Sequence, residues 1–298
     1  MIFDIKLTSN CDSKCTFCHI WQLPVVHLGF YKVLNLIDKY PEPKHEFIFS
    51  GGECLLHPDI YKIITYASNR LINFLILTNG IDYERFENAV IAGANRFTIS
   101  VDGINHDKIR GVLGNLNTIK WIIKSFGKLV DIRLAYTFSD ANNFDNDKYL
   151  LEELISNGAN ENIYFIIAQD NKSFNIATNS SRKNIKLPHF DNSNIKTSIT
   201  TKNYLTNYFN EEPIMKCSSP QFYISIYQDG NVRYCQSFCY DIILGNIYET
   251  DIAEILENSK WLVAQSNKCP HKNVCWLGCH RRWDLKTQKE LNKVRRTI

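Results

Sequence analysis

The first 170 residues alternate short strand-like runs with helix-length amphipathic stretches, and this alternation constrains the fold more than any other feature of the chain. The predicted strands are Ile2–Leu7, Glu46–Ser50, Phe74–Leu77, Arg96–Val101, Asp131–Thr137 and Ile163–Ala168. The predicted helices between them are Gly29–Tyr40, Pro58–Arg70, Tyr83–Ala92, Leu116–Phe126 and Lys148–Ser156. Strands that alternate with helices build a parallel sheet with helical crossovers. The succession therefore predicts an α/β fold, a partial (β/α)6 TIM-like barrel.

Composition narrows the classes of protein to which the chain can belong. It has 298 residues, of which 44% are hydrophobic and 22% charged, as is typical of a globular protein. That length corresponds to two domains, or to one barrel with an appendage. A net charge of +3 is too small to argue for a nucleic acid or a membrane as partner. We find no apolar run long enough to span a membrane and no signal peptide, so we expect a cytoplasmic protein.

The ten cysteines are clustered rather than scattered. Three lie at positions 11, 15 and 18, one at position 54, and six between positions 217 and 279. In a reducing compartment such clusters indicate metal ligands or catalytic thiols, whereas a disulfide framework is typical of smaller secreted chains. A structural zinc site or a complete iron–sulfur site usually takes four protein ligands. Three thiolates in one short loop therefore predict a metal centre with one open position.

Four motifs follow the first four predicted strands, at the ends where (β/α) barrels carry their active sites. They are Cys11-x3-Cys15-x2-Cys18, Gly51-Gly52-Glu53, Thr78-Asn79-Gly80 and Ser100-Val101-Asp102-Gly103. The glycine pair makes an ordinary turn when taken alone, but before a glutamate it lets a ligand approach the backbone while the carboxylate pairs with an ammonium group. Ser100 and Asp102 share one face of their strand, where they would bind a ribose or cap the next helix.

The three-cysteine motif followed by Gly51-Gly52-Glu53 resembles the radical S-adenosylmethionine superfamily, and FSGGECLLHPD is similar to that family's second strand and loop. The resemblance implies a [4Fe–4S] cluster bound by Cys11, Cys15 and Cys18. It also implies that the amine and carboxylate of S-adenosylmethionine fill the open position. The chemistry of the family is one-electron cleavage to a 5′-deoxyadenosyl radical, which abstracts a hydrogen atom from an unactivated C–H bond.

The same resemblance implies roles for further residues. Glu53 would accept the ammonium group of S-adenosylmethionine, with Gly51 and Gly52 alongside, and Phe17 would lie near the adenine. The remaining candidate cofactor-binding residues are Thr78, Asn79, Ser100 and Arg110, the last two toward ribose and carboxylate. An Asn-Gly pair also marks turns in any protein. Cys54 stands where proline is common in the family, either as a small core residue or as a thiol that faces the radical.

The C-terminal cysteines resemble the twitch or SPASM extension of this superfamily, which carries auxiliary iron–sulfur clusters. The pattern is Cys217-x12-Gly230-x4-Cys235, then ILGNIYETDIAEIL at 243–256, then Cys269-x5-Cys275-x3-Cys279. Ser266 stands where a full SPASM pattern has cysteine, and no cysteine follows Cys279. We therefore expect one auxiliary cluster, bound by four of Cys217, Cys235, Cys269, Cys275 and Cys279, with a structural zinc as the alternative.

Cys239 fits no position of these motifs. It is either an inert thiol or a catalytic thiol that returns a hydrogen atom to a substrate radical, which would make the reaction an epimerisation. The resemblance covers roughly residues 1–170 and 214–282.

Three segments follow from these patterns. We expect residues 1–170 to form a core like that of the radical SAM family, 171–213 a polar linker or a segment that covers substrate, and 214–298 a small cysteine-rich twitch/SPASM-like domain. Within the last, Gln221–Tyr227 and Asn231–Cys235 predict a β-hairpin about Asp229-Gly230, and Thr250–Asn258 predicts a helix. A basic, helical tail begins at His280.

Relatives with such an extension act on peptides, protein side chains, amino sugars and cyclitols. The first predicted strand begins at residue 2, so we expect no leader-binding domain before it, which weakens the interpretation of a peptide substrate without excluding it. We expect hydrogen abstraction from a peptide or natural-product precursor, leading to epimerisation, oxidation or cross-linking. The alternatives are dehydrogenation or epimerisation of an amino sugar or cyclitol and, remotely, a non-catalytic metal-stabilised binding protein. The partners would be that substrate and an electron donor such as flavodoxin or ferredoxin.

Overall fold

The computed structural model describes residues 1–41, 44–167, 195, 223–234 and 242–259. Its first six strands are β1 Ile2–Thr8, β2 Glu46–Gly51, β3 Phe74–Thr78, β4 Arg96–Ser100, β5 Asp131–Phe138 and β6 Tyr164–Ile167. The helices are α1 Phe30–Lys39, α2 Ile60–Asn69, α3 Tyr83–Ile91, α4 His106–Arg110, α5 Asn115–Phe126 and α6 Phe144–Ser156. Single turns of 3-10 helix lie at η1 Ile20–Gln22 and η2 Cys54–Leu56. The six predicted strands and five predicted helices are confirmed; α4 was not predicted.

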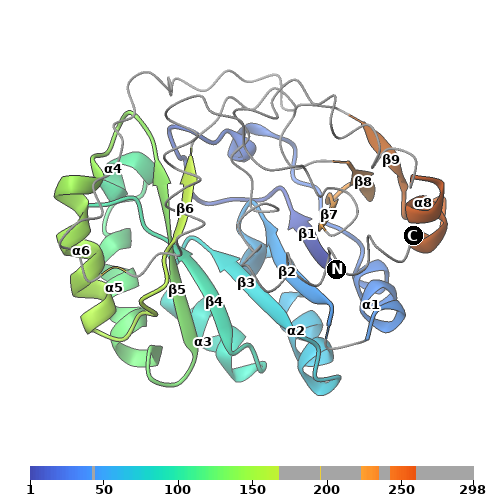
Figure 1. Ribbon diagram of the computed structural model, residues 1–298, viewed down its shortest axis with the longest axis horizontal. Coiled ribbons are helices and arrows are strands. Elements are labelled where there is room, and N and C mark those ends of the chain that lie inside the picture. Colours follow the sequence, from blue (N-terminus) through green and yellow to red (C-terminus); the bar gives the residue numbers. More distant parts are fainter. Residues whose placement is uncertain (42–43, 168–194, 196–222, 235–241, 260–298) are drawn as a thin grey trace, which may run out of the picture.

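β1 to β6 are parallel neighbours in chain order, which is the partial barrel that the alternation predicted. The sheet is curved and the helices cover its outer face (Figure 1). Alternate residues of β1 explain this arrangement, because Phe3, Ile5 and Leu7 are fully buried in the core on the helix side. The intervening Asp4 faces the other side, where its carboxylate accepts hydrogen bonds from Tyr223 and Ser50.

Three more strands, β7 Tyr223–Ile226, β8 Asn231–Arg233 and β9 Ile243–Asn246, extend the sheet beyond β1. β7 pairs with β1 in parallel, and β8 and β9 follow in antiparallel pairing. The predicted hairpin about Asp229-Gly230 is therefore confirmed, and Gly230 supplies the left-handed turn at φ 84°. The hairpin does not stand apart from the barrel, because the otherwise exposed edge of β1 offers it a row of backbone partners.

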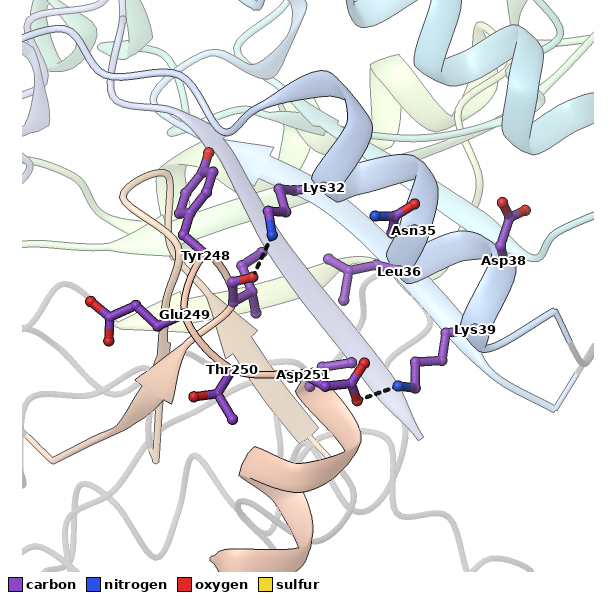
Figure 2. Close-up of a pocket in the computed structure, with 11 residues that line it drawn as sticks. Lys32, Asn35, Leu36, Asp38, Lys39, Tyr248, Glu249, Thr250 and Asp251 are labelled. Carbon is purple, nitrogen blue, oxygen red and sulfur yellow. Dashed lines mark hydrogen bonds and ion pairs between the residues drawn. The ribbon is translucent and has the colours of Figure 1, made fainter.

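Helix α8, Ile252–Asn258, follows β9, so the predicted helix at 250–258 is confirmed with Asp251 as its N-cap. The segment between β9 and α8 lies next to α1, and the two line a groove of about 600 Å³ (Figure 2). The backbone N–H of Gly29 donates to the Tyr248 hydroxyl (2.7 Å), and Lys32 Nζ donates to the carbonyl of Ile247 (2.8 Å). These contacts join the C-terminal strands to the barrel on its outer side.

Several predicted features lie outside the described residues. They are most of the polar segment 171–213, the basic tail from 280, and the cysteines at 217, 235, 239, 269, 275 and 279. The auxiliary cluster ligands and the role of Cys239 therefore stay predictions. No helix within the described part of the chain is long and apolar enough to cross a lipid bilayer.

Candidate functional site

The three-cysteine loop leaves the carboxyl end of β1 and is held against α4. The backbone N–H of Lys14 donates to the carbonyl of Arg110 (2.8 Å), and that of Thr16 donates to the carbonyl of Ile109 (2.9 Å). These two bonds flank Cys15 on both sides. Gly111 permits the close approach, because a Cβ at this left-handed residue would lie 3.0 Å from the Cβ of Lys14. The loop that carries the cysteines is thereby fixed in position by the backbone of another element.

The three thiols suit an iron–sulfur cluster in chemistry and in placement. All three cysteines are free, Cys15 is buried, and Cys11 and Cys18 are partly exposed. Burial raises the pKa of Cys11 to about 12, helped by the nearby charges of Glu53, Cys15 and Cys18, while a backbone hydrogen bond from Ser13 opposes the rise. The Cys11 thiol therefore becomes a thiolate ligand when a metal centre supplies compensating positive charge.

No three Cys, His, Asp or Glu side chains converge on one point, as ligands of a single metal ion would, anywhere in the described part of the chain. A four-iron cluster needs no such convergence, because each of its thiolates binds a different iron. The three free thiols of this loop match the expected ligand set of a [4Fe–4S] cluster with one open position, Cys11, Cys15 and Cys18.

The glycine pair at the end of β2 packs directly on this loop. Gly51 has φ 137°, and a Cβ there would stand 2.3 Å from the carbonyl oxygen of Thr8. A Cβ on Gly52 would stand 2.3 Å from the carbonyl oxygen of Asn10, and the Gly52 N–H donates to Thr8 (2.7 Å). We expected the glycines to let a ligand approach the backbone. The structure adds a different reason for them, since they let the cysteine loop itself lie against β2.

Glu53 follows the glycines and is 1% exposed. Its carboxylate accepts two backbone hydrogen bonds, from Leu55 (3.0 Å) and from Asn79 (2.6 Å). Burial raises the pKa of Glu53 to about 7, although these two hydrogen bonds favour the charged form. None of the ion pairs among the described residues involves Glu53. The carboxylate is thus oriented by neutral donors and retains lone pairs for a further, cationic donor.

Thr78 and Asn79 connect the ends of β1, β2 and β3. The side-chain amide of Asn79 donates to Asp12 (2.7 Å) and to Ser13 (3.0 Å), both in the cysteine loop. Asp12 in turn pairs with Arg85 of α3 (2.7 Å). Thr78 accepts a hydrogen bond from the N–H of Gly80 (3.2 Å). Both predicted residues are buried and hold the loops that form the site.

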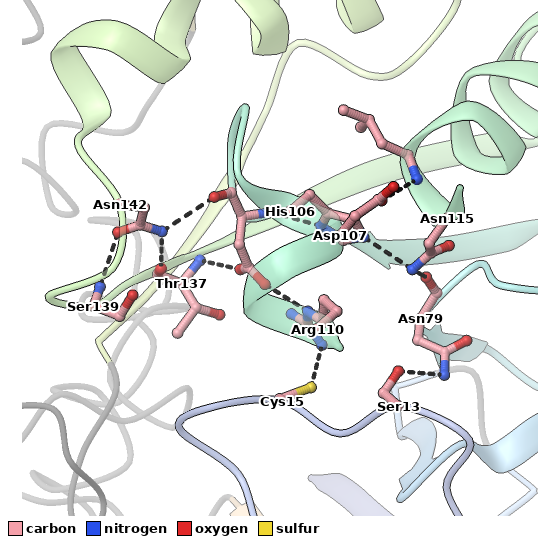
Figure 3. A network of polar contacts seen from close by, with 12 residues as sticks. Ser13, Cys15, Asn79, His106, Asp107, Arg110, Asn115, Thr137, Ser139 and Asn142 are labelled. Atoms are coloured by element: carbon pink, nitrogen blue, oxygen red, sulfur yellow. Dashed lines mark hydrogen bonds and ion pairs between the residues drawn. The ribbon is translucent and has the colours of Figure 1, made fainter. Parts of the chain in front are cut away.

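Asp102 and Arg110 form an ion pair next to the cysteine loop, with their side chains 0% and 9% exposed (Figure 3). Arg110 Nε donates to one carboxylate oxygen of Asp102, and the other oxygen accepts from the N–H of Thr137 (3.1 Å). Arg110 Nη1 donates to the sulfur of Cys15 at 3.6 Å, and the guanidinium carbon lies 5.4 Å from the centre of the Phe17 ring. The sequence indicated Arg110 and Phe17 separately, and the structure brings them together at Cys15.

The Ser-x-Asp spacing predicted that Asp102 binds a ribose or caps the next helix, and it did not predict an ion pair with Arg110. The alternative of a helix cap is wrong for Asp102, because α4 begins after Asn105 and the Asp102 side chain binds Arg110 instead. Ser100, its neighbour on the strand, is half-buried. The ion pair could have been recognised from an aspartate at the end of a predicted strand that is followed, eight residues later, by an arginine.

His106 and Asn115 complete the polar network next to the cysteine loop (Figure 3). His106 Nδ1 accepts from the N–H of Asp102 (3.1 Å), and its Nε2 contacts the Asn115 amide (2.9 Å), which also donates to the carbonyl of Asn79 (3.3 Å). Burial lowers the pKa of His106 to about 4, with a further contribution from the charge of Arg110. This histidine is therefore neutral at pH 7 and links the ends of β3 and β4.

Cys54 lies in the core. Its side chain is 0% exposed and Sγ donates to the carbonyl of Leu77 (3.0 Å). Burial raises the pKa of this thiol well above its usual range, and the charge of Glu53 adds to the rise. The placement agrees with the reading of Cys54 as a small core residue.

The chain is similar in sequence to several known proteins, over part or nearly all of its length. The AdoMet-dependent heme synthase of Methanosarcina barkeri is 31% identical over 118 residues, which are 37% of this chain and 34% of that protein. The chain thus spans about a third of this relative's length. The sporulation killing factor maturation protein SkfB of Bacillus subtilis is 22% identical over 320 residues, covering 92% of this chain and 68% of SkfB.

Among solved structures, SuiB of Streptococcus suis has the same fold, with a TM-score of 0.64 and 16% sequence identity over 85% of this chain and 64% of SuiB.

Two family profiles match the chain in succession. That of the radical SAM superfamily matches residues 5–154, and that of the SPASM iron–sulfur cluster-binding domain matches residues 217–280. The two domains imply a [4Fe–4S] cluster, S-adenosylmethionine and auxiliary iron–sulfur clusters as cofactors. Half of the chain matches the first profile, and its strand ends bring three thiols, a buried glutamate and a buried ion pair together, so this protein belongs to the radical SAM superfamily.

Proposed function

We propose that this protein abstracts a hydrogen atom from a C–H bond of a peptide and so modifies it. The observation that carries the proposal is the convergence at one barrel rim of the three-cysteine loop, Gly51-Gly52-Glu53 and the Asp102–Arg110 pair. When bound, the cluster and S-adenosylmethionine supply a 5′-deoxyadenosyl radical, which is the hydrogen-abstracting species. The residues of the chain bind and orient these groups.

Peptide as the substrate class is supported by two relatives. SkfB is a maturation protein for a sporulation killing factor, and it covers nearly all of this chain. SuiB has also been solved with its precursor peptide SuiA bound, and that structure has a TM-score of 0.64 to this chain at 14% identity. The partial sequence overlap with heme synthase is confined to less than half of the chain and favours no substrate.

We assign the roles of the site residues as follows. Glu53 accepts the ammonium group of S-adenosylmethionine, because its carboxylate is fixed by two backbone donors and has no cation of its own in the described structure. Phe17 offers a ring at the same rim for the adenine, and Ser100 a hydroxyl for the ribose. Arg110 uses Nε and one Nη1 donor on Asp102 and Cys15, and its other N–H groups stay available for the carboxylate.

The reaction class is tested by reconstitution with iron and sulfide in an anaerobic chamber, followed by dithionite and S-adenosylmethionine. We expect 5′-deoxyadenosine from the wild-type protein and background amounts from Cys15→Ala, which lacks one cluster ligand. The matched control is Cys54→Ala, which removes a core thiol outside the loop and retains 5′-deoxyadenosine formation. An iron-loaded protein that forms no 5′-deoxyadenosine, with or without peptides, would contradict the proposal.

The substrate class is tested in the same assay with a pool of short peptides and a panel of amino sugars and cyclitols. We expect peptides alone to raise the rate of 5′-deoxyadenosine formation and to change mass. In deuterated buffer, an epimerised product has one C–H hydrogen replaced by deuterium, because the hydrogen atom that is abstracted is replaced by one from an exchanged thiol. Epimerisation that persists in Cys239→Ala would exclude Cys239 as the hydrogen donor. A mass change in an amino sugar, with every peptide unchanged, would replace the peptide by that class.

A further inference from the structure

Cys15 differs from the two other cysteines of its loop in having a cationic partner. Arg110 Nη1 donates to Cys15 Sγ at 3.6 Å, and this is the one contact from an arginine or lysine to a thiol of the loop in the described structure. Cys11 has a backbone hydrogen bond from Ser13 instead. The loop is thus asymmetric: the guanidinium donates a hydrogen bond to one of the three sulfurs, that of Cys15, while its charge also acts on Cys18.

The position of this guanidinium is fixed from several sides. Asp102 accepts from Nε and is itself anchored by the N–H of Thr137 (3.1 Å). The backbone of Arg110 is bound to the loop, because its carbonyl accepts from Lys14, next to Cys15 (2.8 Å). The Phe17 ring, 5.4 Å from the guanidinium carbon, lies on a further side. An arginine held in this way cannot turn away from Cys15 without breaking a buried ion pair.

A cation at a ligand sulfur acts on the electron affinity of an iron–sulfur cluster. Reduction by an external donor adds one electron to a group that three thiolates already make negative. Hydrogen bonds and positive charge at the sulfurs stabilise the more negative, reduced form, and the effect is strong in a buried place. A buried guanidinium on Cys15 therefore makes reduction easier.

We propose that Arg110, held by Asp102, is a positioning residue that raises the reduction potential of the cluster through its hydrogen bond to Cys15. The proposal goes beyond a contact of Arg110 with S-adenosylmethionine. It rests on the family membership of the chain and not on the proposed peptide substrate, so it can be tested without any peptide.

The test is a redox titration of the reconstituted full-length protein without substrate, followed by electron paramagnetic resonance. The relevant signal is the one that changes when S-adenosylmethionine is added, which separates this cluster from auxiliary clusters. We expect a more negative midpoint potential in Arg110→Gln than in the wild type. Arg110→Lys keeps the charge but loses the planar fork, and its potential should lie between the two.

Arg96→Gln is the matched control, because it removes the same charge at the first residue of β4, the end of that strand away from Asp102 and Arg110, where Arg96 pairs with Glu46 (3.1 Å). Its potential should equal that of the wild type.

Equal potentials in Arg110→Gln and the wild type, at equal iron content, would overturn the proposal. An equal shift in Arg96→Gln would also overturn it, since the effect would then be one of net charge. If neither Arg110 variant takes up iron while Arg96→Gln does, Arg110 serves to build the site, and the proposed tuning is wrong.

Discussion

Two buried carboxylates lie after β2 and β4 at the same rim, and they are stabilised in opposite ways. Glu53, after β2, is held by two backbone N–H groups, and burial raises its pKa to about 7. Asp102, after β4, is paired with the Arg110 guanidinium. One carboxylate is therefore oriented but lacks a cation, whereas the other already has one.

This difference in pairing indicates different roles for the two carboxylates at the rim. A carboxylate with a built-in cation is part of the protein's own framework, and Asp102 uses its oxygens to hold Arg110 near Cys15. A buried carboxylate without one is costly to ionise and gains most from a cation that arrives with a ligand. The contrast agrees with the roles that we propose, Asp102 in building the site and Glu53 in binding a cationic group of the ligand.

The largest expected effect is on the stability of the Asp102→Asn variant, which tests whether Asp102 belongs to the framework of the site. Removing the charge leaves the Arg110 guanidinium buried without its partner, and we expect a loss of about 3–5 kcal/mol in the free energy of unfolding. Urea denaturation at pH 7 measures it. The double variant Asp102→Asn/Arg110→Met should recover much of the loss, because no isolated charge remains. A loss below about 1 kcal/mol, within the range of an exposed pair, would contradict a framework role.

The raised pKa of Glu53 should make the free energy of unfolding of the ligand-free protein depend on pH. Its pKa is about 7 in the folded protein and near 4.5 when exposed, so the folded state binds the proton more tightly. The stabilisation is fully present below pH 4.5 and is lost as the pH rises through 7. Between these limits the wild type should lose about 3 kcal/mol relative to Glu53→Gln. Thermal unfolding from pH 5 to pH 8 measures the difference, and parallel profiles would refute it.

Binding of S-adenosylmethionine gives the next largest effect. Truncating one partner of a buried charge pair costs about 2 kcal/mol or more, so Glu53→Gln should bind about thirtyfold more weakly at pH 8. Equilibrium dialysis under anaerobic conditions measures the affinity. Asp38→Asn, which removes the same charge from the exposed side of α1, is the control and should bind normally. Unchanged affinity in Glu53→Gln would remove the distinction between the two carboxylates.

A neutral hydrogen bond far from the rim provides the baseline. Tyr248→Phe removes the bond from the Gly29 N–H, which helps to join the C-terminal strands to α1. We expect a loss of about 1 kcal/mol, because such a bond replaces one to water. Urea denaturation beside Tyr149→Phe, an exposed tyrosine, isolates the effect. A loss as large as that of Asp102→Asn would show that the rim carboxylates are not exceptional.

Much of this molecule was predictable from local pattern. The six barrel strands, five helices and the hairpin about Asp229-Gly230 all occur, because apolar periodicity and turn residues act over short distances. The short helix α4 was not predicted, since its five residues are too few to show a period. The strand β9 was also not predicted. Its four residues show no strand pattern of their own, and they form a strand by pairing with β8.

The sequence by itself determined the chemistry of the rim, since three cysteines in eight residues and a Gly-Gly-Glu after the next strand specify ligand types whatever their exact placement. Only the tertiary structure decided which of these residues act on one another. Arg110 is 95 positions from Cys15 in the chain, and β7 is more than 200 positions from its partner β1. Such pairings depend on how the sheet curves and which edges meet, and those are properties of the packed molecule that no local pattern encodes.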